Sequence, residues 1–291
     1  MHMPSWLHRL LPFLADSADA PQWSDAHITD EWFRAHFTYA ADVVAKWIGP
    51  ERIRGARMLD FGAGDGITLL GLMLRHGLGS ALGVDISTTH KGLLALARKQ
   101  IGLRRLPRGL TFERIAPGAP FACRQAPVPL IMSWSTFEHV PLAQMNAIFT
   151  RLRELLAEDG RFFLQINPLF YSPFGAHLSR FGLPPWAHLL WSEAELEQAV
   201  HTFAGDIPPD EMEENFFKRS MGGYKQFVLN EYRALNRITA DELTARLQQA
   251  GFTIEREQRA QVDLTVPPEL LERFAEADLR VEEIRLLMRR S

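Results

Sequence analysis

Glycine occupies alternate positions 62, 64 and 66, directly after a short apolar run that contains the carboxylate of Asp60. Glycine tolerates positive φ angles and lets a ligand approach backbone N–H groups that a Cβ would block. The next eight residues, 67–74, are mostly apolar and lack the alternation of a strand, which predicts a helix. A glycine-rich loop between a strand and a helix indicates a site for a nucleotide-type cofactor.

The spacing of glycines and acids indicates which cofactor this loop holds. A dinucleotide-binding loop needs its third glycine at position 67, where this chain has Ile67, so NAD is disfavoured. Asp85 ends the next apolar run, about 20 residues beyond the glycines, where a carboxylate that binds ribose is expected. Acids at two strand ends suit a ligand with an amine-bearing or cationic end and a ribose diol, and S-adenosylmethionine (SAM) has both.

Further segments extend this pattern: 82–87, 129–140, 152–166 and 243–252. Together with the glycine loop they resemble, in order, the class I SAM-dependent methyltransferases, over residues 56–166 and again from 238. The resemblance implies an α/β fold with a doubly wound, mostly parallel, seven-stranded Rossmann-like sheet. It also implies that Asp85 binds the ribose hydroxyls and that Ile86 flanks the adenine. The full set of cofactor contacts that we predict is Asp60, Gly62, Gly64, Gly66, Asp85, Ile86 and Ser133.

Two departures from the family pattern concern the third and fourth strands. Many relatives end the third strand with an acid that receives the adenine amino group, whereas this chain offers only Ala116 or Pro117. We therefore expect a main-chain contact to adenine. Pro129 replaces the acid that usually opens the fourth strand, which is tolerated because a first strand residue needs no ladder N–H.

Glu138 and His139 lie in the turn after the fourth predicted strand. In the family that the chain resembles, this turn lies beside the methyl group of SAM. Methyl transfer mainly requires in-line alignment, and a base helps only when the acceptor must lose a proton. His139 is our candidate base because histidine titrates near neutral pH, although it could equally hydrogen-bond the backbone to shape the turn. Glu138 would orient the histidine or the substrate, or cap the helix that begins near Pro141.

Residues 168–236 break the alternation of strand and helix and are rich in proline and aromatic residues. A connection this long is usually functional, and it leaves the sheet edge where such folds bind ligands, so we predict a substrate lid. Short helices are expected at 192–200, with a capping box, and at 210–218. We predict that Trp134, Tyr171, His177 and Trp191 contact the substrate. An aromatic cage of Trp134, Tyr171 and Trp191 is one alternative, and an ordinary apolar lid core is the other.

A metal ion is not expected. Glu138 and His139 would need a further acid upstream in the same turn, and the chain has Ser133, Ser135 and Thr136 there.

Four segments follow from this pattern: an N-terminal helical cap (1–55), the cofactor-binding core (56–167), the lid (168–236) and the C-terminal part of the core (237–291). In the cap, Asp30 precedes a helical run, 33–48, that stops at Gly49. Tyr39 or His36 would touch the cofactor, or else pack on the first helix of the core. In the C-terminal part we expect a helix at 238–250 and an antiparallel pair of strands at 252–262 and 281–289.

Composition excludes several classes of protein. The 291 residues carry a net charge of −3, so the chain lacks the basic field that dominates nucleic-acid affinity. A single cysteine, Cys123, forbids an intrachain disulfide and fits a cytoplasmic location. No run is long and apolar enough for a membrane anchor, and the apolar segment 6–14 is interpreted as an amphipathic cap or dimer contact.

Together, these features predict a cytoplasmic methyltransferase, monomeric or homodimeric, that acts on a small molecule of secondary metabolism or on a sugar. O-methylation is favoured, with N- or S-methylation as alternatives. Two rival readings are an RNA methyltransferase and a non-catalytic SAM- or nucleotide-binding partner subunit.

Overall fold

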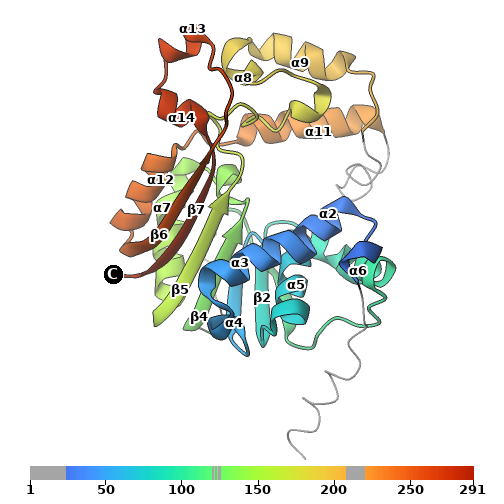
Figure 1. Cartoon of the computed structure of the whole chain (residues 1–291), viewed down its shortest axis with the longest axis vertical. Coiled ribbons are helices and arrows are strands. Elements are labelled where there is room, and N and C mark those ends of the chain that lie inside the picture. The colour runs from blue at the N-terminus through green and yellow to red at the C-terminus, as the bar shows by residue number, and fades with distance from the viewer. Residues whose placement is uncertain (1–23, 120, 122, 124–125, 208–219) are drawn as a thin grey trace, which may run out of the picture.

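A computed structural model describes residues 24–119, 121, 123, 126–207 and 220–291 (Figure 1). Its centre is a seven-stranded sheet with the strand order β3-β2-β1-β4-β5-β7-β6. The first five strands are parallel, and β7 runs antiparallel to both β5 and β6. This arrangement confirms the predicted doubly wound α/β fold. The strands are β1 (Arg57–Phe61), β2 (Ser80–Asp85), β3 (Leu110–Arg114), β4 (Val128–Trp134), β5 (Leu156–Ile166), β6 (Phe252–Gln261) and β7 (Val281–Arg290).

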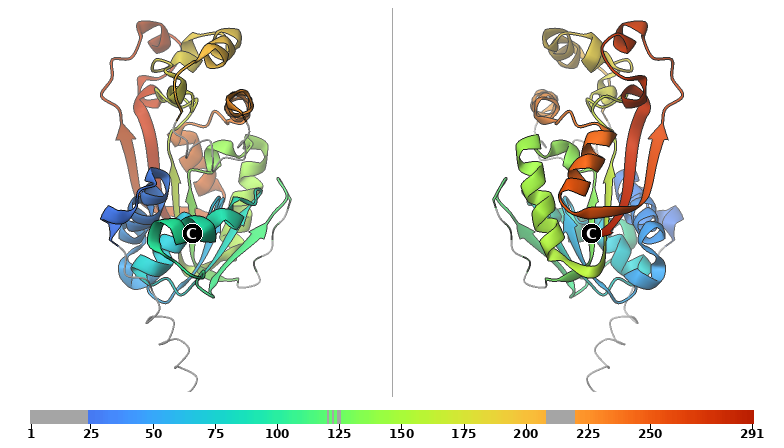
Figure 2. Two further views of the ribbon diagram at one scale, coloured as in Figure 1. Left: turned by 90° about the vertical axis from the view of Figure 1, so that its right-hand side faces the viewer. Right: turned by 90° about the vertical axis from the view of Figure 1, so that its left-hand side faces the viewer.

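Helices cover both faces of this sheet (Figures 1 and 2). One face packs against α3 (Ala41–Ile48), α5 (Ile67–His76) and α6 (Leu93–Ile101), in a core that includes Val44, Leu69 and Ile101. The other face packs against α7 (Leu142–Leu155) and α12 (Ala240–Gln249), in a core that includes Phe149 and Leu243. Because apolar side chains are buried on both faces, the central strands β1 and β4 read as nearly continuous apolar runs.

The predicted N-terminal helix is present. The Asp30 side chain accepts a hydrogen bond from the Phe33 N–H at 2.8 Å and begins α2 (Glu31–Arg34). A π-helical segment (Ala35–Ala40) connects α2 to α3, and Gly49 ends α3 with a φ of 101°. Pro50 then opens the short α4 (Pro50–Ile53). The apolar segment 6–14 lies outside the described residues.

The lid region contains α8 (Ala187–Leu190), α9 (Glu193–Thr202) and α11 (Met221–Ala234) above the edge where β5 ends (Figure 1). Helix α9 begins with the predicted capping box of Ser192 and Glu195. The predicted helix 210–218 lies outside the described residues, and α11 was not predicted. The lid has its own apolar core of Leu178, Phe181, Leu196, Val200, Tyr224 and Val228 among others.

The connection between β6 and β7 also packs against the lid. It contains α13 (Pro268–Leu271) and α14 (Glu276–Arg280), and Leu270 and Leu279 are buried against Trp186. The Trp186 indole N–H donates to the Leu279 carbonyl at 3.2 Å. The β6–β7 connection therefore holds this part of the lid in place. Within the described part of the chain, no helix combines the length and the apolar character that a membrane crossing requires.

Candidate functional site

The glycine loop and Asp85 meet at the carboxyl edge of the sheet. Parallel pairing of β1 and β2 places Phe61 opposite Val84, so the residues that follow each strand are neighbours. The Gly64 N–H donates to Asp85 Oδ2 at 2.8 Å, and the Ser87 N–H donates to Asp85 Oδ1 at 2.6 Å. Each oxygen can accept further hydrogen bonds, so the carboxylate is held in place with capacity left for a ribose diol.

Glycine is required in this loop for two different reasons. All three glycines have positive φ, at 82°, 53° and 81° for residues 62, 64 and 66. A Cβ on Gly62 would lie 2.2 Å from the Thr136 side chain, and one on Gly66 would lie 2.3 Å from the Phe112 ring. A Cβ on Gly64 would meet no described atom within 4 Å, so this residue faces open space that a ligand can fill.

Asp60 fits the amine-bearing end of SAM, the cofactor that the resemblance implies. Its side chain is buried, and its Oδ1 has no hydrogen-bond partner among the described residues. Burial raises the pKa of this carboxyl group well above its usual value, and the charges of Asp85 and Asp65 raise it further. A ligand ammonium group would supply the missing donor and favour the charged form.

The other two predicted cofactor contacts differ from each other. Ile86 is 54% exposed beside Asp85, which suits a side chain that an adenine ring would cover. Ser133 is fully buried, and its hydroxyl donates to the Phe61 carbonyl at 2.8 Å. This hydrogen bond ties β4 to β1, so the geometry supports a positioning role for Ser133 and does not support the predicted contact.

The N-terminal helices approach the same edge. The Trp32 indole N–H donates to Asp65 Oδ2 at 2.7 Å, and Trp32 and Tyr39 are both about half exposed. The Tyr39 hydroxyl accepts from Arg285 at 2.7 Å, and its ring contacts Trp134 edge-on. His36 instead contacts the Trp32 carbonyl through Nδ1. Trp32 and Asp65 were missed by the sequence analysis, because neither spacing nor a motif connects them.

The turn after β4 carries Glu138 and His139 on the 3-10 helix η4 (Phe137–His139). Asn236, at the end of the lid, holds this turn: its side-chain amide donates to the carbonyls of Phe137 and Val140, and its backbone N–H donates to the Glu138 carbonyl. Asn236 was also not predicted, because no motif or spacing in the sequence connects it with the turn.

A second network fixes the start of the same turn. Ser135 has a φ of 45°, and both its N–H and its hydroxyl donate to the Gln165 side-chain oxygen, at 3.0 and 2.9 Å. Gln165 donates in turn to Glu283 at 2.8 Å, and Glu283 pairs with Arg285. Because Arg285 also donates to Tyr39, one polar chain joins the turn, two strands and the N-terminal helices.

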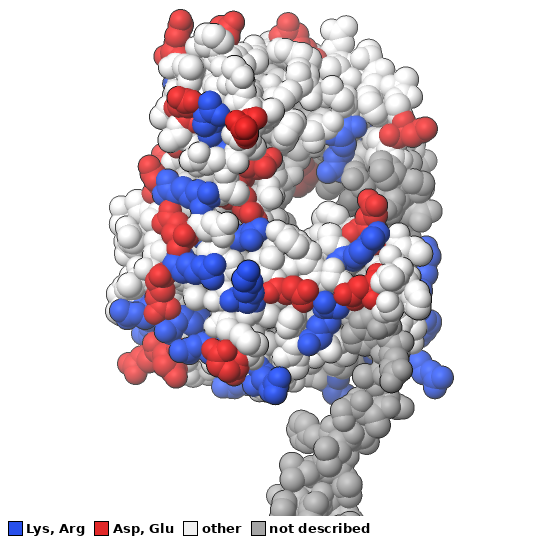
Figure 3. Space-filling model, viewed as in Figure 1, with Lys and Arg blue, Asp and Glu red and all other residues white. Residues whose placement is uncertain are grey.

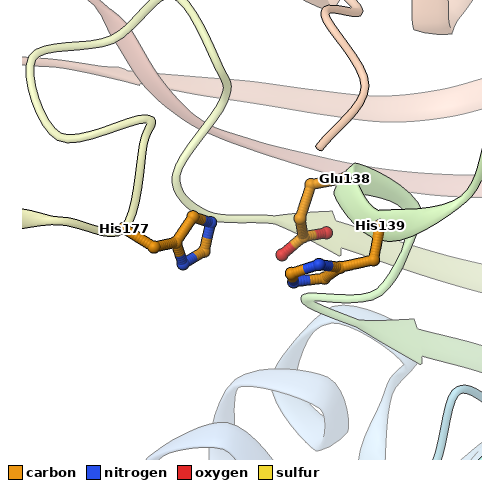
Figure 4. Close-up of side chains that lie close together, drawn as sticks. All are labelled: Glu138, His139 and His177. Atoms are coloured by element: carbon orange, nitrogen blue, oxygen red, sulfur yellow. The ribbon is translucent and has the colours of Figure 1, made fainter. Parts of the chain in front are cut away.

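Glu138, His139 and His177 lie together below the lid (Figure 4). One ligand atom from each lies within 4.8 Å of those from the other two. Glu138 is buried with neither carboxylate oxygen hydrogen-bonded within the described structure, and burial raises its pKa to about 8. Burial also lowers the pKa of His139, and burial together with neighbouring His139 and Arg180 lowers that of His177 to about 3. Both imidazoles are therefore neutral at pH 7 and offer a lone pair.

A pocket of about 180 Å³ opens beside these histidines. Its polar wall includes Glu231, whose Oε2 lies 3.5 Å from His139 Nδ1. Helix α11, the lid helix that the sequence did not predict, supplies most of the lining. The lining residues are His139, His177, Arg180, Tyr224, Phe227, Val228, Glu231, Tyr232 and Leu235.

Of the four predicted substrate contacts, His177 lines this pocket and the other three do not. Trp134 stacks on Phe163 in the core of the sheet, and Tyr171 packs against Phe274 of the β6–β7 connection. Trp191 is 37% exposed where α8 ends. Trp134 and Tyr171 pack against separate apolar clusters, which favours the apolar-core alternative over an aromatic cage.

Comparison with known proteins identifies the family of the chain. Residues 32–257 match the model of a methyltransferase domain family. No curated protein sequence matches the chain significantly.

Solved structures with a similar fold share little sequence with the chain. PKMT2 from Rickettsia typhi has a TM-score of 0.50 at 14% identity, over 86% of this chain and 52% of that one. The PH0226 protein from Pyrococcus horikoshii has a TM-score of 0.50 at 15% identity, over 91% and 93%. A SAM-dependent methyltransferase from Mesorhizobium loti has a TM-score of 0.47 at 19% identity, over 86% of this chain and 100% of that one. The chain spans about half the length of the Rickettsia protein, which has also been solved with AdoHcy.

The family match covers more than half of the chain, including the glycine loop, Asp85, the Glu138–His139 turn and the lid. The sheet is seven-stranded and mostly parallel, as the resemblance implied. The chain therefore belongs to this methyltransferase family, whose cofactor is SAM.

Proposed function

We propose that the protein transfers the methyl group of SAM to a hydroxyl group of a small molecule bound in the pocket under the lid. The observation that carries this proposal is the position of His139, which lies on the turn after β4 and also lines the pocket. A pocket of about 180 Å³ suits a small acceptor, such as part of a natural product or a sugar. Arg180 and the aromatic residues Tyr224 and Tyr232 give it a polar and an apolar wall.

Alignment of acceptor and donor is the main task of the protein in this reaction. Bound SAM supplies an electrophilic methyl group on a sulfonium that is a good leaving group. The acceptor oxygen forms a bond to the methyl carbon as the carbon–sulfur bond breaks, and the hydroxyl proton must leave. The chain contributes a neutral His139, whose lone pair can activate the hydroxyl. A hydroxyl is favoured over nitrogen or sulfur acceptors because it gains most from such a group.

The cellular setting and the architecture belong to the same proposal. We place the reaction in the cytoplasm, because the single cysteine, Cys123, is buried and free. The division into cap, core, lid and C-terminal segment stays a proposal, as does a monomeric or homodimeric state.

The first test is calorimetric titration of SAM and S-adenosylhomocysteine into the purified protein, with NAD as the control ligand. We expect both sulfur ligands to bind and NAD not to bind. The Asp85→Ala variant should weaken SAM binding by ~10²-fold, because two charge-assisted hydrogen bonds to the ribose are lost. The matched control is Asp159→Ala, an exposed acid within β5, far from the loop along the chain, which should bind like the wild type.

A panel of small hydroxylated acceptors with labelled SAM then tests the transfer itself. Labelled products from amines or thiols alone would contradict O-methylation. Binding of NAD without SAM would contradict the cofactor assignment, and unchanged SAM affinity in Asp85→Ala would contradict the role of that carboxylate.

A further inference from the structure

Glu138, His139 and His177 form a cluster in which two side chains, Glu138 and His177, have buried polar atoms without a hydrogen-bond partner in the described structure. Both oxygens of Glu138 and the Nε2 of His177 are buried and lack a hydrogen-bond partner in the described structure. Glu138 is 3% exposed, so its carboxylate is shielded from bulk solvent. Buried polar atoms of this kind cost about 1 to 3 kcal/mol each unless a ligand satisfies them.

We propose that Glu138, His139 and His177 form a binding site for one divalent first-row transition-metal ion, which coordinates the acceptor hydroxyl. The second part of this statement rests on the proposed function, whereas metal binding itself does not. The three side chains come from two segments, the turn after β4 and the start of the lid, and they point toward one another (Figure 4).

The distances within the cluster suit a metal ion. Metal bonds to imidazole nitrogen and carboxylate oxygen measure about 2.0 to 2.2 Å, so two ligand atoms of one ion lie up to about 4.4 Å apart. The ligand atoms of Glu138, His139 and His177 all lie within 4.8 Å of one another. A small rotation of one side chain therefore brings all three into coordination.

The donor set also indicates the kind of ion. Two neutral imidazoles and one carboxylate suit zinc, cobalt, iron or manganese better than calcium or magnesium, which prefer oxygen ligands. Three protein ligands leave open coordination positions, as in catalytic rather than structural sites. Since His139 and His177 both line the pocket, the open positions face the acceptor.

Glu231 completes the site from the lid. Its Oε2 lies 3.5 Å from His139 Nδ1, the place from which a carboxylate orients a metal-bound imidazole. In the proposed step the coordinated acceptor hydroxyl becomes more acidic and passes its proton to Glu231. The acceptor oxygen then forms the bond to the methyl carbon, and the electron pair of the broken carbon–sulfur bond stays on sulfur. With the ion bound, the lone pair of His139 is used for coordination, and Glu231 replaces His139 as the group that accepts the hydroxyl proton.

A metal ion at this site is contrary to the expectation from sequence, which looked for an acid upstream in the same turn, at positions 133, 135 and 136. The third ligand is His177 instead, which follows the turn by helix α7, strand β5 and the start of the lid. His177 has a φ of 58°, an uncommon angle outside glycine that the surrounding lid must hold in place.

The test is metal titration of the chelator-treated full chain, without SAM, using Co²⁺ by visible absorption and Zn²⁺ by calorimetry. We expect one ion per chain with each probe. The variants Glu138→Gln and His177→Asn should each weaken binding by ~10²-fold; asparagine is chosen because it tolerates a positive φ. The matched control is His201→Ala, an exposed lid histidine near Glu197, which should bind as the wild type does.

Thermal unfolding of each metal-free variant shows whether it is folded. Failure of the folded wild type to bind either ion, or unchanged affinity in both variants, would overturn the proposal. Methyl transfer at full rate in the presence of a chelator would overturn the role of the ion in the reaction. Absent methyl transfer with intact metal binding would instead contradict the proposed function, so the two failures are distinguishable.

Discussion

The Glu138 carboxyl group is buried under the lid and has no hydrogen-bond donor from any described residue, which is unfavourable for a charge. Burial raises its pKa to about 8, so the metal-free folded protein carries this group protonated at neutral pH. An unfolded chain would ionise it near its ordinary value of 4.5. The folded state therefore binds one more proton than the unfolded state between these two pKa values.

This difference predicts how stability depends on pH. In chelator, the unfolding free energy of the wild type should fall by about 1 to 2 kcal/mol between about pH 6.5 and 8, because the stabilising proton is lost as pH rises. The Glu138→Gln variant should show a shallower slope over the same range, because the raised pKa of Asp60 still contributes a slope of the same sign. Below that range the lowered pKa values of His177 and His188 act in the opposite direction, since their neutral forms are favoured by folding.

Urea unfolding of both proteins at several pH values measures this slope. Equal slopes in wild type and variant would show that Glu138 is already ionised in the folded protein.

At the scale of elements, the lid is hydrogen-bonded directly to the turn after β4. Asn236 follows helix α11 and binds the turn through three hydrogen bonds, to the carbonyls of Phe137, Glu138 and Val140. Its side-chain oxygen also accepts from the Ile238 N–H, just before α12. A displacement of α11, which lines the pocket, would thereby reach Glu138 and His139 in this turn.

The Asn236→Ala variant should test this coupling. We expect a loss of about 2 to 4 kcal/mol in unfolding free energy, because buried carbonyls are left unpaired. Methyl transfer should fall by ~10²-fold, since small displacements of positioning groups have effects of that size. The matched control is Asn230→Ala, on the exposed side of the same helix, where only a bond from Gln226 is lost. Activity that stays normal in Asn236→Ala would show that the turn holds its shape alone.

At the scale of the whole molecule, net charge and surface charge bear on whether a nucleic acid can be the acceptor. Lysine and arginine alternate with aspartate and glutamate over the face in Figure 3, with no continuous basic surface on it. The net charge is −3. Neither the total nor this face supplies the field that attracts phosphate backbones.

Binding of a structured RNA should therefore be weaker than ~10⁻⁴ M at physiological salt. Fluorescence anisotropy at two salt concentrations measures it, with SAM binding by the same sample as proof of an intact site. Tight binding that weakens steeply with added salt would favour an RNA acceptor over a small molecule.

The cofactor half of the molecule was predictable from sequence because its parts are local. Gly62, Gly64 and Gly66 follow one strand, Asp85 ends the next, and parallel pairing of consecutive strands brings their carboxyl ends together. Apolar runs and capping residues likewise predicted β6, β7 and α9, since a strand or helix is specified by its own periodicity and ends.

The acceptor half depends on contacts between distant segments. His177 meets Glu138 and His139, Asn236 holds their turn, and Glu231 faces His139, although none of these pairs has a diagnostic spacing. For the same reason the sequence could not separate an aromatic cage from an apolar core: Trp134 and Tyr171 suit either, and the folded chain packs them against different clusters. Local patterns and the order of the elements along the chain predict the fold and the cofactor, because each motif is made of residues close together in the sequence. The proposed acceptor site could be found only in the folded chain, because it arises where the lid packs against the turn.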